Sequence, residues 1–343
     1  LVELVDLGVE DVLGPVGAGE GDLVLAEGAG QVAVGLGRRV GEVRVGADAE
    51  RLGGAAFGST WSVTLPAGQA TPRLHAQISE LLDGLDRAFS PWRADSVIGR
   101  FNATEAQDFA VSEEIADVTR AALGIAEASG GRFDPTVGPL VARWGFGPIL
   151  TGEAQAEGWR GITAGTGHLA KAGRGLTLDL CGIAKGHALD RMVTLLREAG
   201  HDDFLVDLGG ELVARGRHPS GRPWQVGVED PRPEADGLYA ALGLEEAAIA
   251  TSGSRANGYD VGGRRYSHII DPATGEPVAT SLASVSVLMP TAREADGWAT
   301  ALMAAGADGP DMARRLGLSA LFLIREETGL GAIATGTFER HLS

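Results

Sequence analysis

The stretch Asp179-Leu-Cys-Gly-Ile-Ala-Lys-Gly186 joins two segments of different periodicity. Residues 176–180 have the apolar character of a strand, and residues 186–199 repeat apolar side chains at helical spacing until a glycine ends the pattern. We therefore predict a strand that enters a helix through a glycine turn. Backbone N–H groups at such a helix start can hold an anion. An ordinary strand-to-helix turn explains the same pattern, and the spacing is neither a Walker loop nor GxGxxG.

The elements on both sides of this stretch mix helices with strands. Helices are predicted at Pro72–Phe89, after the capping residue Ser112, at Ala292–Ala305 and at Asp311–Leu316. Strands are predicted at Trp61–Leu65, Phe204–Leu208, Trp224–Val228, Ala283–Leu288 and Leu321–Ile324. Because the strands form hairpin-like clusters without strict helix–strand alternation, we predict an α+β fold with mixed or antiparallel sheets and packed helices.

The first 53 residues differ in composition from the rest of the chain. They are rich in glycine, valine and acidic residues and contain neither aromatic residues nor lysine. Residues 31–36 and 41–45 could form short alternating strands, and a loosely ordered segment explains the composition equally well. We therefore divide the chain into an N-terminal extension, residues 1–53, to which we assign no function, and a folded domain, residues 54–343.

Composition limits the possible functions. A net charge of −17 disfavours nucleic-acid and anionic-membrane surfaces, although it does not exclude an anionic ligand. The sequence has no apolar run of about 18 residues, so we expect no transmembrane segment. The single cysteine, Cys181, excludes an internal disulfide and a cysteine zinc cluster. The acidic start is unlike a secretory signal, so we expect a cytoplasmic protein; export or membrane association stays open if a signal precedes this sequence.

Two segments carry the chemically informative side chains. His268-Ile-Ile-Asp-Pro-Ala-Thr-Gly-Glu-Pro277 places an imidazole, a carboxylate and a hydroxyl in a turn-forming segment. Farther along, Asp296 and Thr300 are four residues apart in a predicted helix, so both side chains should lie on one face. Such oxygen ligands suit Mg²⁺, although a helix surface pair has the same spacing. A histidine and a Mg²⁺ site together indicate phosphate chemistry.

Six sequence blocks, taken in order, resemble the ApbE family of FAD:protein FMN transferases. They are Phe89-Ser-Pro-Trp-Arg-Ala-Asp-Ser96 with Arg100-Phe-Asn102, Asp134-Pro-Thr-Val-Gly-Pro-Leu140 with Trp144-Gly-Phe-Gly-Pro148, Asp179–Gly186, Asp207-Leu-Gly-Gly-Glu211, Thr251-Ser-Gly253 with Tyr266–Pro277, and Asp296-Gly-Trp-Ala-Thr-Ala301. The resemblance covers residues 54–340 and implies a single ApbE-like domain after the extension.

The resemblance implies a Mg²⁺-dependent reaction in which FAD is the substrate. FMN from FAD would be joined by a phosphoester bond to a Ser or Thr of an acceptor flavoprotein, and AMP would be released. Two alternatives stay open. A FAD pyrophosphatase giving FMN and AMP would need the same metal and pocket. A non-catalytic FAD-binding protein would leave FAD intact.

The resemblance also implies roles for individual residues. His268 would act as the base for the acceptor hydroxyl, and Asp271 would orient or assist it. The metal would be held by Asp296, Thr300 and the backbone carbonyl of Ala184, with that of Gly182 as the alternative. The flavin and its diphosphate would contact Phe57, Trp92, Arg132, Phe133, Asp134, Asp179, Lys185 and Ile270.

Three positions depart from the family pattern. Trp92 stands where the family often has tyrosine, and Phe57 stands where methionine is common. Both exchanges keep an apolar side chain that can pack on a flavin. Cys181 replaces the usual glycine or serine beside the expected metal turn. None of the three removes a chemical group that the reaction needs.

Overall fold

The computed structural model describes residues 2–4, 43–44, 48–155, 157–232, 235, 237–254, 258–261, 264–278 and 281–342. The strand considered at residues 31–36 lies outside these ranges, and of residues 41–45 only Val43–Arg44 is described, as strand β2. Strand β3 begins at Ala49, inside the segment that the sequence assigned to the extension. The division of the chain into an extension and a domain stays a prediction.

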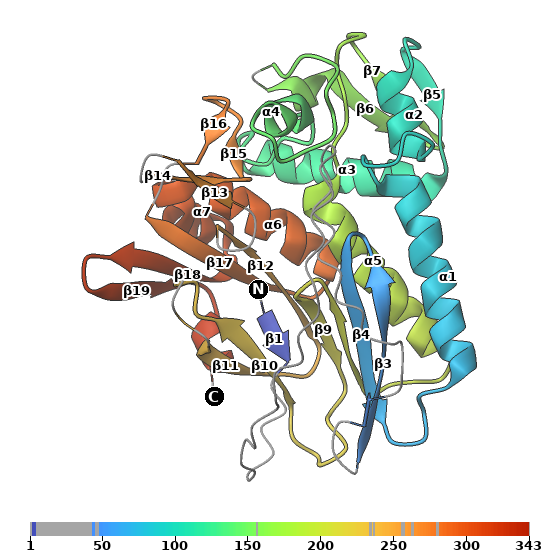
Figure 1. Cartoon of the computed structure of the whole chain (residues 1–343), viewed down its shortest axis with the longest axis vertical. Helices are drawn as coiled ribbons and strands as arrows, with labels where there is room; N and C mark the ends of the chain where they lie inside the picture. The colour runs from blue at the N-terminus through green and yellow to red at the C-terminus, as the bar shows by residue number, and fades with distance from the viewer. Residues whose placement is uncertain are drawn as a thin grey trace, which may run out of the picture.

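A nine-stranded sheet forms the centre of the described structure (Figure 1). Its strands in spatial order are β19 (Gly329–Ala334), β18 (Ser319–Glu326), β17 (Leu282–Met289), β12 (Ala247–Gly253), β9 (Glu211–Arg215), β8 (Phe204–Leu208), β4 (Ser59–Pro66), β3 (Ala49–Ala56) and β2 (Val43–Arg44). Each neighbouring pair in it is antiparallel. The predicted α+β class is therefore confirmed.

Both faces of this sheet are buried. The helices on one face are α1 (Pro72–Phe89), α5 (Cys181–Glu198) and α6 (Ala292–Ala304), and α3 (Glu113–Ala128) packs against α5 and α6. The other face packs on a three-stranded sheet of β1 (Val2–Leu4), β10 (Trp224–Glu229) and β11 (Leu238–Leu244). Successive strand residues supply the two cores in turn: Val206 and Val213 belong to the helix-side core, and Leu205 and Leu212 to the other. The central strands are therefore continuously apolar rather than alternating.

Smaller elements surround the edge of the sheet at which the site lies. They are α2 (Val97–Ala103), α4 (Gly138–Arg143), α7 (Gly309–Leu316), the strands β5 (Asp108–Ala110), β6 (Ile162–Gly165) and β7 (His168–Lys171), and the hairpins β13 (Gly258–Val261)–β14 (Arg264–Ser267) and β15 (Ile270–Asp271)–β16 (Glu276–Pro277). Single 3₁₀ turns lie at Gly158–Gly161, Gly306–Asp308 and Phe338–His341. Helix α4 was not predicted, because its segment is dominated by loop-forming glycine and proline.

The predicted strand at residues 176–180 is wrong. The segment is extended but pairs with no strand in the described structure. The side chain of Asn102 substitutes for a neighbouring strand: its Nδ2 donates to the Leu178 carbonyl at 2.9 Å, and the Leu178 N–H donates to its Oδ1 at 2.7 Å. A side chain 76 residues away satisfies the backbone here, which periodicity cannot reveal.

Helix α5 also begins at Cys181, five residues before the predicted start at Gly186. The cause is Asp179, whose Oδ1 accepts a hydrogen bond from the Cys181 N–H at 2.9 Å. Such a bond satisfies a backbone donor of the first helical turn, which has no partner within the helix. The predicted glycine turn is therefore the first turn of the helix itself.

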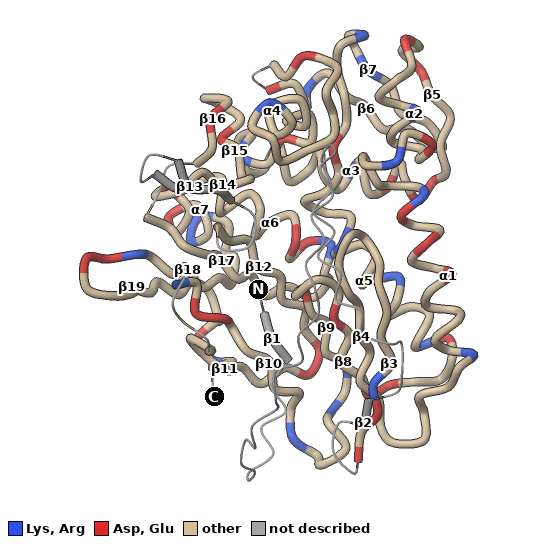
Figure 2. Tube along the Cα trace, in the orientation of Figure 1, with Lys and Arg blue, Asp and Glu red and all other residues tan. Residues whose placement is uncertain are grey.

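Charged residues of both signs are interspersed along the described chain (Figure 2). In the ranges that the structure describes, no helix combines the length and apolarity needed to cross a bilayer.

Candidate functional site

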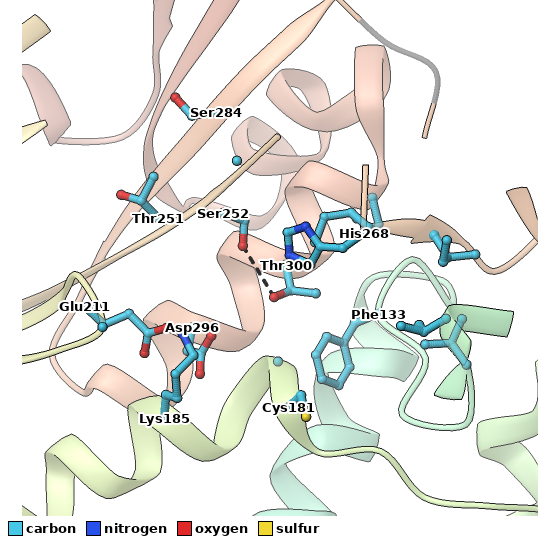
Figure 3. A pocket seen from close by; sticks show the side chains of 18 of the residues that line it. Phe133, Cys181, Lys185, Glu211, Thr251, Ser252, His268, Ser284, Asp296 and Thr300 are labelled. Atoms are coloured by element: carbon cyan, nitrogen blue, oxygen red, sulfur yellow. Dashed lines mark hydrogen bonds and ion pairs between the residues drawn. The ribbon is translucent and has the colours of Figure 1, made fainter. Parts of the chain in front are cut away.

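A cavity of about 520 Å³ lies where segments far apart in the sequence meet beside the central sheet. Figure 3 shows that α5 and α6 contribute side chains on one side, and the Phe133 and His268 segments on the other. The predicted site residues that line it are Phe57, Arg132, Phe133, Asp134, Asp179, Lys185, His268, Ile270, Asp296 and Thr300. Of the predicted set, Trp92, Ala184 and Asp271 are described but do not line this cavity.

Asp296 and Thr300 project from α6 into the cavity from the same side, one helical turn apart. Asp296 is 5% exposed, and its Oδ2 accepts a hydrogen bond from the Gly186 N–H of α5 at 3.0 Å. Burial raises the pKa of Asp296 to about 8, and Glu211 adds to this, while Lys185 and the Gly186 N–H oppose it. A bound cation would favour the ionised form of this carboxylate.

The two helices that carry these groups are in direct contact. A Cβ on Gly186 would lie 2.2 Å from the carbonyl oxygen of Ala292, so only glycine fits at this crossing. The first N–H groups of α6, those of Ala292 and Arg293, donate to the two carboxylate oxygens of Asp190 in α5, at 2.8 and 3.0 Å. Asp190 thus caps α6 from its neighbour. Because Asp296 bonds back to α5, each helix fixes the other.

Lys185, whose side chain is 34% exposed, forms an ion pair with the buried Glu211 in the cavity (Figure 3). Burial lowers the pKa of Lys185, but the Glu211 and Asp296 carboxylates outweigh it, so the net pKa lies above the ordinary value. Glu211 is 4% exposed, and its Oε1 is the atom that meets the ammonium. Among the described residues, Oε2 of Glu211 has no hydrogen-bond partner. The lysine is therefore charged, and one carboxylate oxygen beside it is unused.

The two backbone carbonyls predicted as alternative metal ligands, those of Ala184 and Gly182, both belong to α5. Ala184 is buried within the first turns of α5 rather than in a separate turn. Gly182, the alternative, lines the cavity, and a Cβ there would lie 3.1 Å from Thr300 Oγ1. The Gly186 N–H, which in a regular helix faces the Gly182 carbonyl, donates to Asp296. The choice between the Ala184 and Gly182 carbonyls as the metal ligand stays a prediction.

The Trp-Gly-Phe-Gly-Pro block after α4 supports the histidine segment. Trp144 Nε1 donates to the Gly275 carbonyl at 2.9 Å, and the indole stacks on Tyr266 with ring centroids 5.7 Å apart. The Phe146 ring meets the His268 imidazole edge-on at 6.4 Å. These contacts indicate an ordered loop that positions His268.

The carboxylate of Asp271 contacts Arg132 and the backbone of the turn after β15. Its Oδ1 lies 3.6 Å from Nη1 of Arg132 and accepts the Ala273 N–H at 3.0 Å. Arg132 also reaches Asp308 with a 3.4 Å contact. Asp271 therefore shapes the turn after β15 and holds the cavity-lining guanidinium, and its assistance to His268 stays a prediction.

Two further predicted residues use their carboxylates to order backbone. Asp134 Oδ1 accepts from the N–H and the hydroxyl of Thr136, at 2.8 and 2.6 Å, and Asp179 caps α5 as described above. Burial raises the pKa of both groups, opposed by these hydrogen bonds. Both line the cavity, but as supports of its loops.

The two aromatic departures from the family pattern differ in placement. Phe57 and Gly58 form the two-residue turn between β3 and β4, with φ of 54° and 67°. Phe57 lines the cavity from this left-handed conformation, which non-glycine residues rarely adopt. Trp92, by contrast, is 64% exposed and lies outside the cavity.

The sequence analysis assigned no role to two residues that line the cavity, Glu211 and Ser252. The hydroxyl of Ser252 lies 3.4 Å from that of Thr300, which adds an oxygen beside the predicted metal pair (Figure 3). Both residues belong to blocks that the sequence analysis noted, Asp207–Glu211 and Thr251–Gly253. Their membership of these blocks was the available signal.

Comparisons with known proteins point to one family. The ApbE family model matches residues 57–322. A FAD:protein FMN transferase of Klebsiella pneumoniae is 36% identical over 81% of this chain and 85% of its own length, and one of Escherichia coli K12 is 34% identical over 80% and 84%. The solved flavin transferase ApbE from Vibrio cholerae superposes with a TM-score of 0.77 at 31% identity, covering 86% of this chain and 99% of that one. The apo flavinyl transferase ApbE from Pseudomonas stutzeri gives 0.76 at 32%, covering 89% and 98%. The chain belongs to the ApbE family.

Proposed function

We propose that this protein is a FAD:protein FMN transferase, and that its cavity binds FAD and passes the FMN part to a Ser or Thr hydroxyl of an acceptor protein, with release of AMP. One observation carries the proposal. A single cavity brings His268 together with Asp296 and Thr300, in a chain whose relatives are FAD:protein FMN transferases over about four fifths of its length. The enzyme class rests on those relatives, and the assignment of residues rests on the cavity.

The donor set around Asp296 fits Mg²⁺. It consists of oxygen atoms: the Asp296 carboxylate, the Thr300 hydroxyl and the nearby backbone carbonyl of Gly182 or Ala184. The described residues contain no cluster of three His, Cys, Asp or Glu side chains that could hold a metal. Mg²⁺ is commonly held by one or two carboxylates together with substrate phosphates, so a small protein donor set is expected. When bound there, Mg²⁺ would neutralise charge on the diphosphate as the P–O bond between the FMN phosphorus and the departing AMP breaks.

The remaining groups have separate tasks. His268 takes the proton from the acceptor hydroxyl, because a neutral alcohol is a poor nucleophile. Phe146 and the Trp144–Gly275 hydrogen bond fix the segment that carries the imidazole. Lys185, charged and facing the cavity, and Arg132 supply positive charge for the diphosphate. Phe57 and Phe133 offer apolar surface to the flavin ring.

The test is to incubate the protein with FAD, Mg²⁺ and an acceptor domain that carries a Ser or Thr modification site, and to weigh the acceptor by intact-mass spectrometry. We expect a mass increase of one FMN phosphoester, absent when the acceptor residue is changed to alanine. His268→Ala and Asp296→Ala should each abolish the increase.

Each of the other outcomes would indicate a different function for this protein. Free FMN and AMP with an unmodified acceptor would show that water replaces the hydroxyl, which defines a FAD pyrophosphatase. Intact FAD in the presence of Mg²⁺ and several different acceptor domains would contradict both enzymatic functions and leave a binding protein.

A further inference from the structure

Glu211 lies next to the predicted cation site without belonging to the expected donor set. It is the first residue of β9, is 4% exposed, and lines the same cavity as Asp296 and Thr300. Its Oε1 meets the Lys185 ammonium, and its Oε2 has no partner among the described residues. A buried carboxylate oxygen without a partner is costly, so this placement calls for an explanation.

Lys185 has two carboxylates within electrostatic reach, Glu211 and Asp296, and both raise its pKa. In the described structure its ion pair is with Glu211. The Asp296 carboxylate instead accepts a hydrogen bond through Oδ2 from the neutral Gly186 N–H. Asp296 therefore keeps an oxygen that no ammonium occupies, although the ammonium lies close by.

We propose that Glu211 is a positioning residue that holds the Lys185 ammonium away from Asp296 and thereby keeps Asp296 available to a divalent cation. Without Glu211, the nearest carboxylate for Lys185 would be Asp296, and the two would pair. A lysine on Asp296 would compete directly with the cation.

This inference rests on the proposed cation site, and its test measures cation binding without flavin. Mn²⁺ binding is followed by the electron paramagnetic resonance signal of free Mn²⁺ in the wild type, Glu211→Gln, Lys185→Met and the double variant. Glutamine keeps the shape of glutamate but cannot hold an ammonium by charge. We expect Glu211→Gln to weaken Mn²⁺ binding by at least about tenfold, as for other residues that support metal ligands.

The double variant separates positioning from simple loss of charge. If Glu211 acts by holding Lys185, then removing the lysine as well should restore Mn²⁺ binding to within about threefold of Lys185→Met alone, because the effects of coupled residues do not add. If Glu211 acts only as a negative charge, the Glu211→Gln loss will be the same with and without the lysine. That additive result would overturn the inference.

Glu114→Gln is the matched control. Glu114 also pairs with a basic residue of α5, Arg191, but on the side away from the cavity. The Glu114→Gln variant should bind Mn²⁺ with an affinity within about twofold of that of wild type, since independent sites do not couple. Near-ultraviolet circular dichroism verifies that each variant is folded. Glu211→Gln with unchanged Mn²⁺ affinity contradicts the inference. A wild type that binds no Mn²⁺ contradicts it too, whereas flavin transfer is judged separately in the acceptor experiment.

Discussion

Helix α5 pairs with a glutamate on each of two sides, and the two pairs differ in how completely they are satisfied. On the side away from the cavity, Glu114 contacts both His187, at 2.9 Å, and Arg191 through Oε1, and its side chain is 32% exposed, so solvent can satisfy the remainder of the carboxylate. On the cavity side, Glu211 contacts Lys185 through one oxygen and leaves the other without a partner among the described residues. A pair whose polar atoms all have partners or solvent stabilises the packing of the helices. A buried carboxylate oxygen without a partner is instead a place where a bound ligand can supply the missing hydrogen bond.

The same contrast applies to the two aspartates that connect α5 and α6. Asp190 uses both oxygens on backbone N–H groups, and Asp296 uses one. Asp190→Ala should lower the free energy of unfolding by about 1–2 kcal/mol, the usual cost of a lost cap, with FMN transfer within about tenfold of wild type. Asp296→Ala should instead slow transfer by about 10³-fold or more, because it removes a group that stabilises transition-state charge. Transfer rates from intact mass, with urea unfolding, check both. Equal losses of activity in the two variants would contradict the comparison.

Gly186 and Gly124 give a second matched pair. Both lie inside helices, but a Cβ at Gly186 would meet the Ala292 carbonyl at 2.2 Å, whereas one at Gly124 would meet nothing within 4 Å. Gly186→Ala should cost about 2–3 kcal/mol of unfolding free energy through overpacking. Gly124→Ala should be neutral or stabilise by up to about 1 kcal/mol, because alanine is the better helix former. Chemical denaturation measures both, and a Gly186→Ala variant as stable as wild type would mean that α5 and α6 are not locked at this crossing.

The pH dependence of stability should distinguish Asp207 from exposed carboxylates. Burial raises the pKa of Asp207 to about 6, against an ordinary value of 3.8. The folded state therefore binds more protons than the unfolded state between these values, and stability is lost as pH rises through about 6. Asp207→Asn keeps the oxygen that accepts the Gly210 N–H at 2.9 Å. It should be about 2 kcal/mol more stable relative to wild type at pH 8 than at pH 4, by the same linkage. If the difference in unfolding free energy between Asp207→Asn and wild type is the same at pH 4 and pH 8, the prediction is wrong.

The smallest effects are expected for substitutions of Phe57 and Trp92, the two aromatic residues that depart from the family pattern. Phe57→Asn should relieve the left-handed backbone, for a gain of about 1 kcal/mol in stability, and weaken FAD binding because the ring is lost from the cavity. Trp92→Ala removes an exposed ring outside the cavity and should leave FAD affinity within about twofold. Fluorescence titration with FAD compares them. A larger loss at Trp92 would show that this side chain contacts the bound FAD, as the family resemblance implied.

Local patterns identified most of the described α-helices and several of the strands, because each of these buries a face whose period is written in consecutive residues. Helix α1 has the predicted bounds, with a Thr71 cap whose side chain accepts the Leu74 N–H at 3.1 Å. The segment before α5 was misassigned because its partner is the side chain of Asn102 rather than another strand. A hydrogen bond between distant residues leaves no periodic signal at either position.

The sequence by itself determined the α+β class, the family resemblance and ten of the residues that line the cavity, since these depend on local periodicity and on motifs contained in short segments. Only the tertiary structure decided which oxygens remain free. It brought Lys185 to Glu211 rather than to Asp296, turned Asp271 toward Arg132, and left Trp92 outside the cavity. The reason is physical: a buried charge is governed by whichever opposite charge the fold brings nearest, and that distance is set by packing between segments far apart in the chain.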